Sequence, residues 1–435
     1  MQAVPKNDKR LIRSWSMYDW ANSAYNLVIT STIFPAYYTA ITTTAAHGDE
    51  VTFFGMKVIN TALSNFTLAL AYLIMAVCLP FISSYADVQG RKKQIMMFFT
   101  YFGALACMGL FFFKLETLEM GIILFGLAAM GYIGGVLFNN SYLPEIASPA
   151  YQDKVSAQGF AYGYVGCVTL QIICLVFILK PEWFGITDSS FAPRLSFLLV
   201  GLWWAGFSAI PFRALPRNQR SDVRASKSLR RTVILEFRIV LRKIKKMERI
   251  RRFLPAYFFY AAGVQTVMIV AAAFGAKELQ LENSKLIITI LLIQLVAILG
   301  AFLMSRLSAV FGNIKVLIAV VLVWVGICIV AFYIHSEIQF YMLACVVGLV
   351  MGGIQSLSRS TYSKFLPENI RDTTSFFSFY DVTEKLAIVM GLISFALIEQ
   401  LTHNIRFSAL FLSIFFIIGC SLLGRLLRFN KAMTV

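Results

Sequence analysis

Three ionisable residues stand close together inside one long apolar stretch, residues 373–398: Asp381, Glu384 and Lys385. Placing a charged Asp or Lys at the centre of a membrane helix costs about 2.5–3.5 kcal/mol, so such residues usually face a water-filled path. Asp381 and Lys385 are four residues apart and can pair on one helical face, which leaves Glu384 as an additional carboxylate. The pattern favours a proton or substrate site within a membrane. An ion pair that only fixes helix packing is the alternative.

Polar residues also recur at helical spacing near the start of the chain, where Asp19, Asn22 and Asn26 share one face. A polar stripe is costly in lipid, so this face should turn toward a central cavity or a neighbouring helix. Asp19 lies near the predicted membrane surface and suits either a gate or a site. Amide side chains on other predicted helices can contact the substrate or only form hydrogen bonds between helices. Asn140 and Gln294 are further candidates of this kind. The candidate substrate and proton site comprises Asp19, Asn22, Asn26, Asn139, Gln265, Gln355, Asp381, Glu384 and Lys385.

Composition places the whole chain in a bilayer. It is 58% hydrophobic and 14% charged with a mean hydropathy of +0.72, whereas soluble domains carry about 25% charged residues. A helix needs about 20 apolar residues to cross a membrane. Twelve runs satisfy this length, at 14–41, 53–81, 94–113, 119–142, 155–179, 194–214, 251–275, 286–305, 314–334, 338–356, 373–398 and 404–427.

The net charge of +17 follows the predicted topology. With the first segment in the cytoplasm, 31 of the 39 Lys and Arg residues fall on the cytoplasmic side and seven on the outer side, with Lys385 within the membrane. This asymmetry is the positive-inside rule and predicts that both termini are cytoplasmic. Nucleic acid is not an expected partner, because no basic patch interleaved with aromatic residues lies outside the loop between the sixth and seventh runs.

The chain also repeats itself. The Pro-Glu pairs that end at Glu145 and Glu368 are 223 residues apart, and the loop glycines Gly90 and Gly312 are 222 residues apart. Two unrelated landmarks with nearly the same offset predict two six-helix halves, an arrangement typical of alternating-access transporters. The expected organisation is an N-terminal half (1–214), a basic cytoplasmic linker (215–250) and a C-terminal half (251–435).

The loop Ala86–Lys93, which reads Ala-Asp-Val-Gln-Gly-Arg-Lys-Lys, resembles the major facilitator superfamily signature between spans 2 and 3. Trp15–Tyr25, Ser358–Ser360 and Phe376–Asp381 resemble the vacuolar-effluxer-like, autophagy-related branch and its bacterial relatives. The resemblance covers nearly the whole chain. It implies an all-α, twelve-span secondary transporter, and fungal vacuolar members are associated with amino-acid efflux. One departure is Ala309, where the superfamily has an acid, so only the first-half loop is expected to form the full charged latch.

The first-half loop predicts a gate. Gly90 permits a tight turn, and Asp87 can sit at the positive N-terminal end of the eleventh span. Arg91 can pair with Glu145, or serve only as a positive-inside anchor, the role expected of Lys92 and Lys93. Contacts that exist in one state bias a two-state equilibrium. With the second-half counterparts, the predicted gating residues are Asp87, Gly90, Arg91, Glu145, Arg306 and Glu368.

Other functional classes lack support in the sequence. The seven cysteines fall in apolar runs and the three histidines in predicted outer loops, so no metal, disulfide or cofactor is expected. No nucleophile–base set or nucleotide-binding loop indicates an enzyme. We therefore expect a monomeric inner-membrane transporter of a small polar or zwitterionic metabolite, coupled to protons. A lipid or lysophospholipid flippase and a non-transporting membrane receptor are the alternatives.

Overall fold

The computed structural model describes residues 6–43, 48–216, 229–368 and 370–432. The described chain is almost entirely helical, which confirms the predicted fold class. The β-strands in the described residues form one antiparallel hairpin, in which Val51 lies opposite Val58. Its strands are β1 (Glu50–Phe53) and β2 (Met56–Ile59).

The N-terminal bundle contains the first six predicted spans. Its long helices are α1 (Lys9–Ala24), α2 (Ile33–Thr42), α3 (Asn60–Gln89), α4 (Lys92–Gly109), α5 (Leu118–Asn140), α7 (Gln152–Leu179) and α8 (Phe191–Ala214). A π-helix, η1 (Tyr25–Thr32), joins α1 to α2. Short turns complete the bundle: η2 (Leu110–Phe112), η3 (Leu115–Thr117), α6 (Leu143–Ile146) and η4 (Pro181–Phe184).

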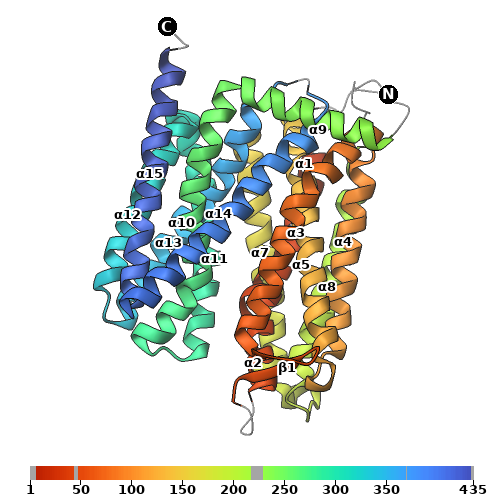
Figure 1. Ribbon diagram of the computed structural model, residues 1–435, viewed down its shortest axis with the longest axis vertical. Helices are drawn as coiled ribbons and strands as arrows, with labels where there is room; N and C mark the ends of the chain where they lie inside the picture. The colour runs from red at the N-terminus through yellow and green to blue at the C-terminus, as the bar shows by residue number, and fades with distance from the viewer. Residues whose placement is uncertain (1–5, 44–47, 217–228, 369, 433–435) are drawn as a thin grey trace.

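The C-terminal bundle contains the other six spans. They are α10 (Glu248–Leu279), α11 (Asn283–Phe311), α12 (Asn313–Tyr333), α13 (Glu337–Lys364), α14 (Thr373–Thr402) and α15 (Ile405–Ala432). The linker helix α9 (Leu229–Lys246) precedes them, and the linker residues 217–228 lie outside the described chain. Figure 1 shows the two bundles side by side, with α9 on the face where α1 begins and α15 ends. We call this the terminal face; the hairpin lies at the opposite face.

Ten of the described helices are long and apolar enough to cross a membrane. The remaining two predicted spans are α14, which carries the three central charges, and the divided helix α1–η1–α2. Two features explain the division. Pro35 has no N–H to donate to the preceding turn, and the hydroxyl of Thr32 donates to the carbonyl oxygen of Leu27 at 2.7 Å. Such π-helical turns often lie at functional sites, and this one supplies Asn26 and Leu27 to the central cavity.

Glycine lets α1 approach α7 closely within the N-terminal bundle. A Cβ added to Gly163 would lie 2.5 Å from the hydroxyl of Ser23, and one added to Gly159 would lie 2.4 Å from a carboxylate oxygen of Asp19. Absence of a side chain at these positions therefore allows the polar face of α1 to lie against α7. Between the bundles, α3 packs against α14, and α7 packs against α11 and α13. These contacts bring the polar faces predicted from the sequence to one seam.

Candidate functional site

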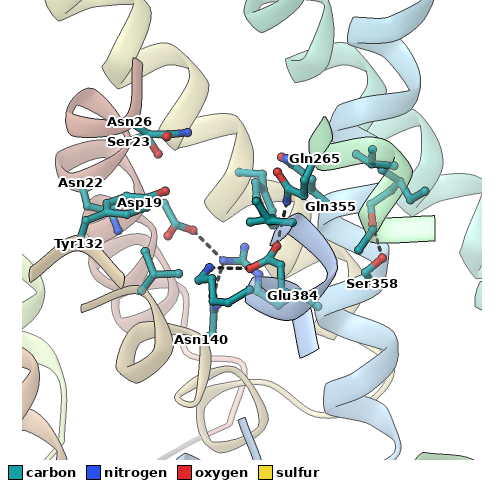
Figure 2. A pocket seen from close by; sticks show the side chains of 18 of the residues that line it. Asp19, Asn22, Ser23, Asn26, Tyr132, Asn140, Gln265, Gln355, Ser358 and Glu384 are labelled. Atoms are coloured by element: carbon teal, nitrogen blue, oxygen red, sulfur yellow. Dashed lines mark hydrogen bonds and ion pairs between the residues drawn. The ribbon is translucent and has the colours of Figure 1, made fainter. Parts of the chain in front are cut away.

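A cavity of about 190 Å³ lies at the seam between the two bundles. Its wall is built by helices of both halves, and the cavity is large enough for several water molecules or a small metabolite. Among the described residues, four acidic or basic side chains line it: Asp19, Arg359, Glu384 and Lys385. In Figure 2, Asp19 and Glu384 reach the cavity from opposite sides. The charged residues therefore form two clusters, one around Arg359 and one around Lys385.

The first cluster joins the halves through Arg359, on α13. Its Nη1 lies 3.1 Å from Oδ2 of Asp19 and donates to Oδ1 of Asn140 at 3.0 Å. Its Nε and Nη2 donate to the hydroxyl and the carbonyl oxygen of Ser156, at 2.9 and 2.8 Å. The guanidinium also lies 4.2 Å from the ring centroid of Phe160. One C-terminal arginine is thus held by three helices of the N-terminal bundle, a strong combination of charge-assisted bonds and ring contact.

The second cluster lies on α14. The Nζ of Lys385 is 3.5 Å from Oδ1 of Asp381 and 3.0 Å from Oε2 of Glu384. Gln265, on α10, donates to the other oxygen of Glu384 at 2.9 Å. The pair of Asp381 and Lys385 has the expected four-residue spacing, and Lys385 also contacts Glu384. Two carboxylates therefore share one ammonium group.

Most of the predicted amides line the cavity. Asn22, Asn26, Gln265 and Gln355 lie in its wall, as do Asn140 and Gln294. Gln355 accepts a hydrogen bond from the hydroxyl of Tyr164 at 2.7 Å, which joins the halves again. Two predicted site residues lie behind the wall instead. Asn139 is fully buried and donates to Asp19 at 3.0 Å. Asp381 is buried behind Lys385, which lines the cavity and pairs with it.

Asp87, predicted to belong to a gate, joins the end of α3 to the start of α14. Asp87 is buried, and its Oδ2 accepts from the backbone N–H and the hydroxyl of Ser375, both at 2.7 Å. This carboxylate thus occupies the positive end of α14. Gly90 ends α3 with φ of +64°, a conformation that a residue with a side chain rarely adopts.

The basic partner in this gate differs from the expected one. Arg91 is exposed, whereas Lys92 is fully buried and its Nζ lies 2.8 Å from Oε1 of Glu145. Lys92 also donates to the hydroxyl of Thr373 at 3.1 Å, and Thr373 donates to Glu145 at 2.6 Å. Arg91 is the N-cap residue of α4, outside the first turn, and Lys92 is the first helical residue. The pairing of Arg91 with Glu145, and the role of Lys92 as an anchor only, were therefore wrong. We call the contacts of Asp87, Lys92 and Glu145 with the start of α14 the first latch.

A second group of charged contacts, which we call the second latch, joins the halves at the loop between α11 and α12. Because Ala309 replaces the acid of the superfamily signature, we expected only a partial latch there. Asp153, in the first turn of α7, accepts from the ammonium of Lys364 and from Asn313 Nδ2 at 2.7 Å. Ser308 donates to the same carboxylate at 2.9 Å. The acid missing from the second-half loop is thus supplied by the opposite half. Of the predicted second-half gating residues, Arg306 is exposed and Glu368 lies at the surface, 3.9 Å from Lys6.

Helix α9 packs beside the first latch on the terminal face. Phe237 contacts Phe81 of α3 and Phe379 of α14, with ring centroids 5.1 and 5.8 Å apart. Lys243 pairs with Asp372, directly before α14, at 2.6 Å. The linker therefore contacts both halves at the place where they meet.

The comparisons agree with this architecture. The family model described as "Vacuole effluxer Atg22 like" matches residues 7–434. The uncharacterized MFS-type transporter YxiO of Bacillus subtilis is 30% identical over 415 residues, covering 94% of this chain and 93% of that protein. The chain belongs to the Atg22-like family. It is a multi-pass membrane transporter of the major facilitator type, and not an enzyme.

More distant relatives give a consistent result for this Atg22-like transporter. Autophagy-related protein 22 of Cryptococcus neoformans is 28% identical over 291 residues, which cover 62% of this chain and 50% of that protein. Among solved structures, the transporter FucP in its outward conformation has a TM-score of 0.70 at 11% identity and covers 95% of this chain and 98% of its own. The human organic anion transporter MFSD10 has a TM-score of 0.71 at 13% identity, with 96% and 100% coverage. These structures support the fold.

Two features of the Atg22-like cavity were missed as site residues. Arg359 stood in a recognised motif, but its contact with Asp19 spans 340 positions and leaves no local signal. Six tyrosines also line the cavity, and along the sequence they look like ordinary apolar helix residues. They are Tyr72, Tyr132, Tyr164, Tyr257, Tyr260 and Tyr380.

Proposed function

We propose that this Atg22-like protein is a secondary active transporter that moves a small zwitterionic metabolite, with amino acids as the favoured class. The observation that carries the proposal is the pair of charge clusters on opposite sides of one cavity at the seam. Arg359 and Lys385 supply positive charge, and Asp19 and Glu384 supply negative charge. An amino acid presents a carboxylate and an ammonium to such a site. The relation to vacuole effluxers adds independent support.

Alternating access follows from the distribution of contacts. Those hydrogen bonds described above that join the halves lie at the cavity and on its terminal-face side, where two latches and α9 lie. Breaking these contacts while forming new ones at the opposite face would expose the cavity to the other side. Site and gate are directly linked, because Arg359 holds Asp19 in the cavity wall and Ser156 near the start of α7. We propose that the terminal face is cytoplasmic, as the distribution of Lys and Arg predicts.

Proton coupling is proposed through Glu384. Its side chain is the most exposed of the charged groups in the two clusters, at 20%. The two clusters together hold three carboxylates and two basic groups, so protonation of one carboxylate would bring their summed charge to zero. A carboxylate that can take up and release a proton during the cycle is what a proton-driven transporter requires. We further propose that the protein works as a monomer in the inner membrane.

Reconstitution tests this function. The purified full-length protein in liposomes should accumulate labelled amino acids from a mixture when a pH gradient is imposed, and Asp19→Asn should reduce uptake at least tenfold. Glu399→Gln is a matched control, because Glu399 pairs with Lys277 near the opposite face, away from the cavity. Uptake equal in wild type and Asp19→Asn would contradict the site assignment. Movement of lysophospholipid without amino-acid uptake would favour a flippase instead.

A further inference from the structure

We infer that the preferred substrate of this cavity carries one more positive than negative charge, as a basic amino acid does. The inference rests on the proposed function and narrows its substrate class. Its first support is the charge balance at the seam. Asp19, Asp381 and Glu384 face two basic groups, Arg359 and Lys385, so the ionised clusters hold one surplus negative charge. A charge away from bulk water requires a partner. A monocationic substrate supplies it, whereas a neutral zwitterion needs a proton as well.

The exposure of the charged groups gives the second support. The side chains of Glu384 and Asp19 are 20% and 12% exposed, against 9% for Lys385 and 3% for Arg359. Two of the three carboxylates are therefore more accessible to a ligand than the basic groups are, and Asp381, at 4%, lies behind Lys385. Arg359 is moreover engaged by Asp19, Asn140 and both oxygens of Ser156. The guanidinium is therefore already hydrogen-bonded to the N-terminal half. To bind a substrate carboxylate through two hydrogen bonds, it would have to release these partners.

The aromatic lining gives the third support. Cations bind favourably to the faces of aromatic rings, and both basic groups of the clusters already do so: Lys385 lies 5.7 Å from the ring centroid of Tyr72, and Arg359 lies 4.2 Å from that of Phe160. On the side of Glu384, Tyr257 and Tyr380 stack at 4.3 Å and line the same cavity. An ammonium or guanidinium group near Glu384 would have a carboxylate and tyrosine rings around it.

Two amide side chains in the cavity wall have a polar atom without a hydrogen-bond partner among the described residues, and these atoms suit the carboxylate and the N–H groups of such a substrate. Asn22 is 2% exposed, lines the cavity, and its Nδ2 lacks a hydrogen-bond partner among the described residues. It is a donor suited to the substrate carboxylate. Gln294 also lines the cavity, and its Oε1 lacks a partner in the same part of the chain. It is an acceptor suited to a substrate N–H. The two amides belong to opposite halves, so one ligand would contact both.

A series of amino acids that differ in side-chain charge tests the inference. Binding to the purified full-length protein is measured by calorimetry for L-lysine, Nε-acetyl-L-lysine, L-norleucine and L-glutamate. We expect L-lysine to bind at least tenfold more tightly than each of the other three. Glu384→Gln should reduce this preference to below threefold, while Glu399→Gln, away from the cavity, should retain it.

The outcomes separate the inference from the proposed function. Equal or tighter binding of L-norleucine would overturn the cationic preference and leave amino-acid transport standing. A tenfold preference for L-lysine that persists in Glu384→Gln would also overturn it, because the selecting carboxylate would lie elsewhere. Failure of all four ligands to bind or to enter liposomes would remove both proposals. The comparison among ligands on the wild-type protein does not depend on any variant folding.

Discussion

Arg359 and Asp19 are 340 positions apart in the chain, yet their side chains form an ion pair of 3.1 Å across the seam between the two halves. Asp19 lines the cavity, whereas Arg359 extends from the cavity wall to Ser156 near the start of α7. A ligand that draws Asp19 away from Arg359 would weaken a bond that holds the terminal face closed. The proposed substrate site and the proposed gate are therefore linked through one pair of residues.

Neutralising one member of this pair should destabilise the protein. Asp19→Asn leaves the Arg359 guanidinium buried without its carboxylate, and breaking a buried pair in this way costs about 3–5 kcal/mol. We expect a clear fall in the midpoint of thermal unfolding in detergent. The double variant Asp19→Asn with Arg359→Gln should regain part of the lost stability, because no unpaired charge remains. A double variant less stable than both single variants would contradict the pairing.

The first latch predicts different effects for two adjacent basic residues. Lys92→Ala removes the buried bonds to Glu145 and Thr373, whereas Arg91→Ala removes an exposed side chain. In a variant without native cysteines, a cysteine at Ser156 should react faster with a maleimide in Lys92→Ala. The rate in Arg91→Ala should match that of the parent. Equal acceleration in both would show that charge near the membrane surface, rather than the latch, controls opening.

Helix α9 should dock in a pH-dependent way. Burial above all, and then the nearby carboxylate of Asp372, raises the pKa of Glu236 to about 8; Asp87 acts in the same direction and Lys243 opposes it. Because the docked state binds the proton more tightly, docking is strongest at low pH and weakens as pH rises toward 8. Hydrogen exchange of the α9 amides should accelerate over this range beyond its intrinsic pH dependence. Glu236→Gln should abolish the extra acceleration, and Arg238→Gln, exposed on the same helix, should retain it.

The sequence predicted those features that depend on local physics. A bilayer requires long apolar helices, so the spans could be found from composition, and the pair of Asp381 and Lys385 follows from helical spacing alone. Contacts between the halves could not be found in this way. Three consecutive basic residues, Arg91 to Lys93, look alike until the start of α4 turns Lys92 inward. Likewise, the acid missing at Ala309 was replaced by Asp153 from the other half, which only the packed structure brings near.

The two carboxylates that α14 contributes to the Lys385 cluster, Asp381 and Glu384, should have separable roles. Glu384 is the more exposed carboxylate and accepts from Gln265, so Glu384→Gln should abolish accumulation of a neutral amino acid driven by a pH gradient. Exchange of that amino acid between equal compartments should persist, because glutamine preserves shape and hydrogen bonding. Lys385→Ala should impair binding instead, since it leaves Asp381 buried without its ammonium partner.

Adding Asp381→Asn to Lys385→Ala should restore part of the binding, because the unpaired charge is removed. Counterflow of labelled amino acid and gradient-driven uptake, measured in the same liposome preparations, distinguish the two roles. If uptake in Glu384→Gln still responds fully to the pH gradient, Glu384 is not the coupling acid. If the double variant binds no better than Lys385→Ala, the loss arises from the missing ammonium itself. In that case Lys385 would contact the substrate directly, and Asp381 would serve only to position it.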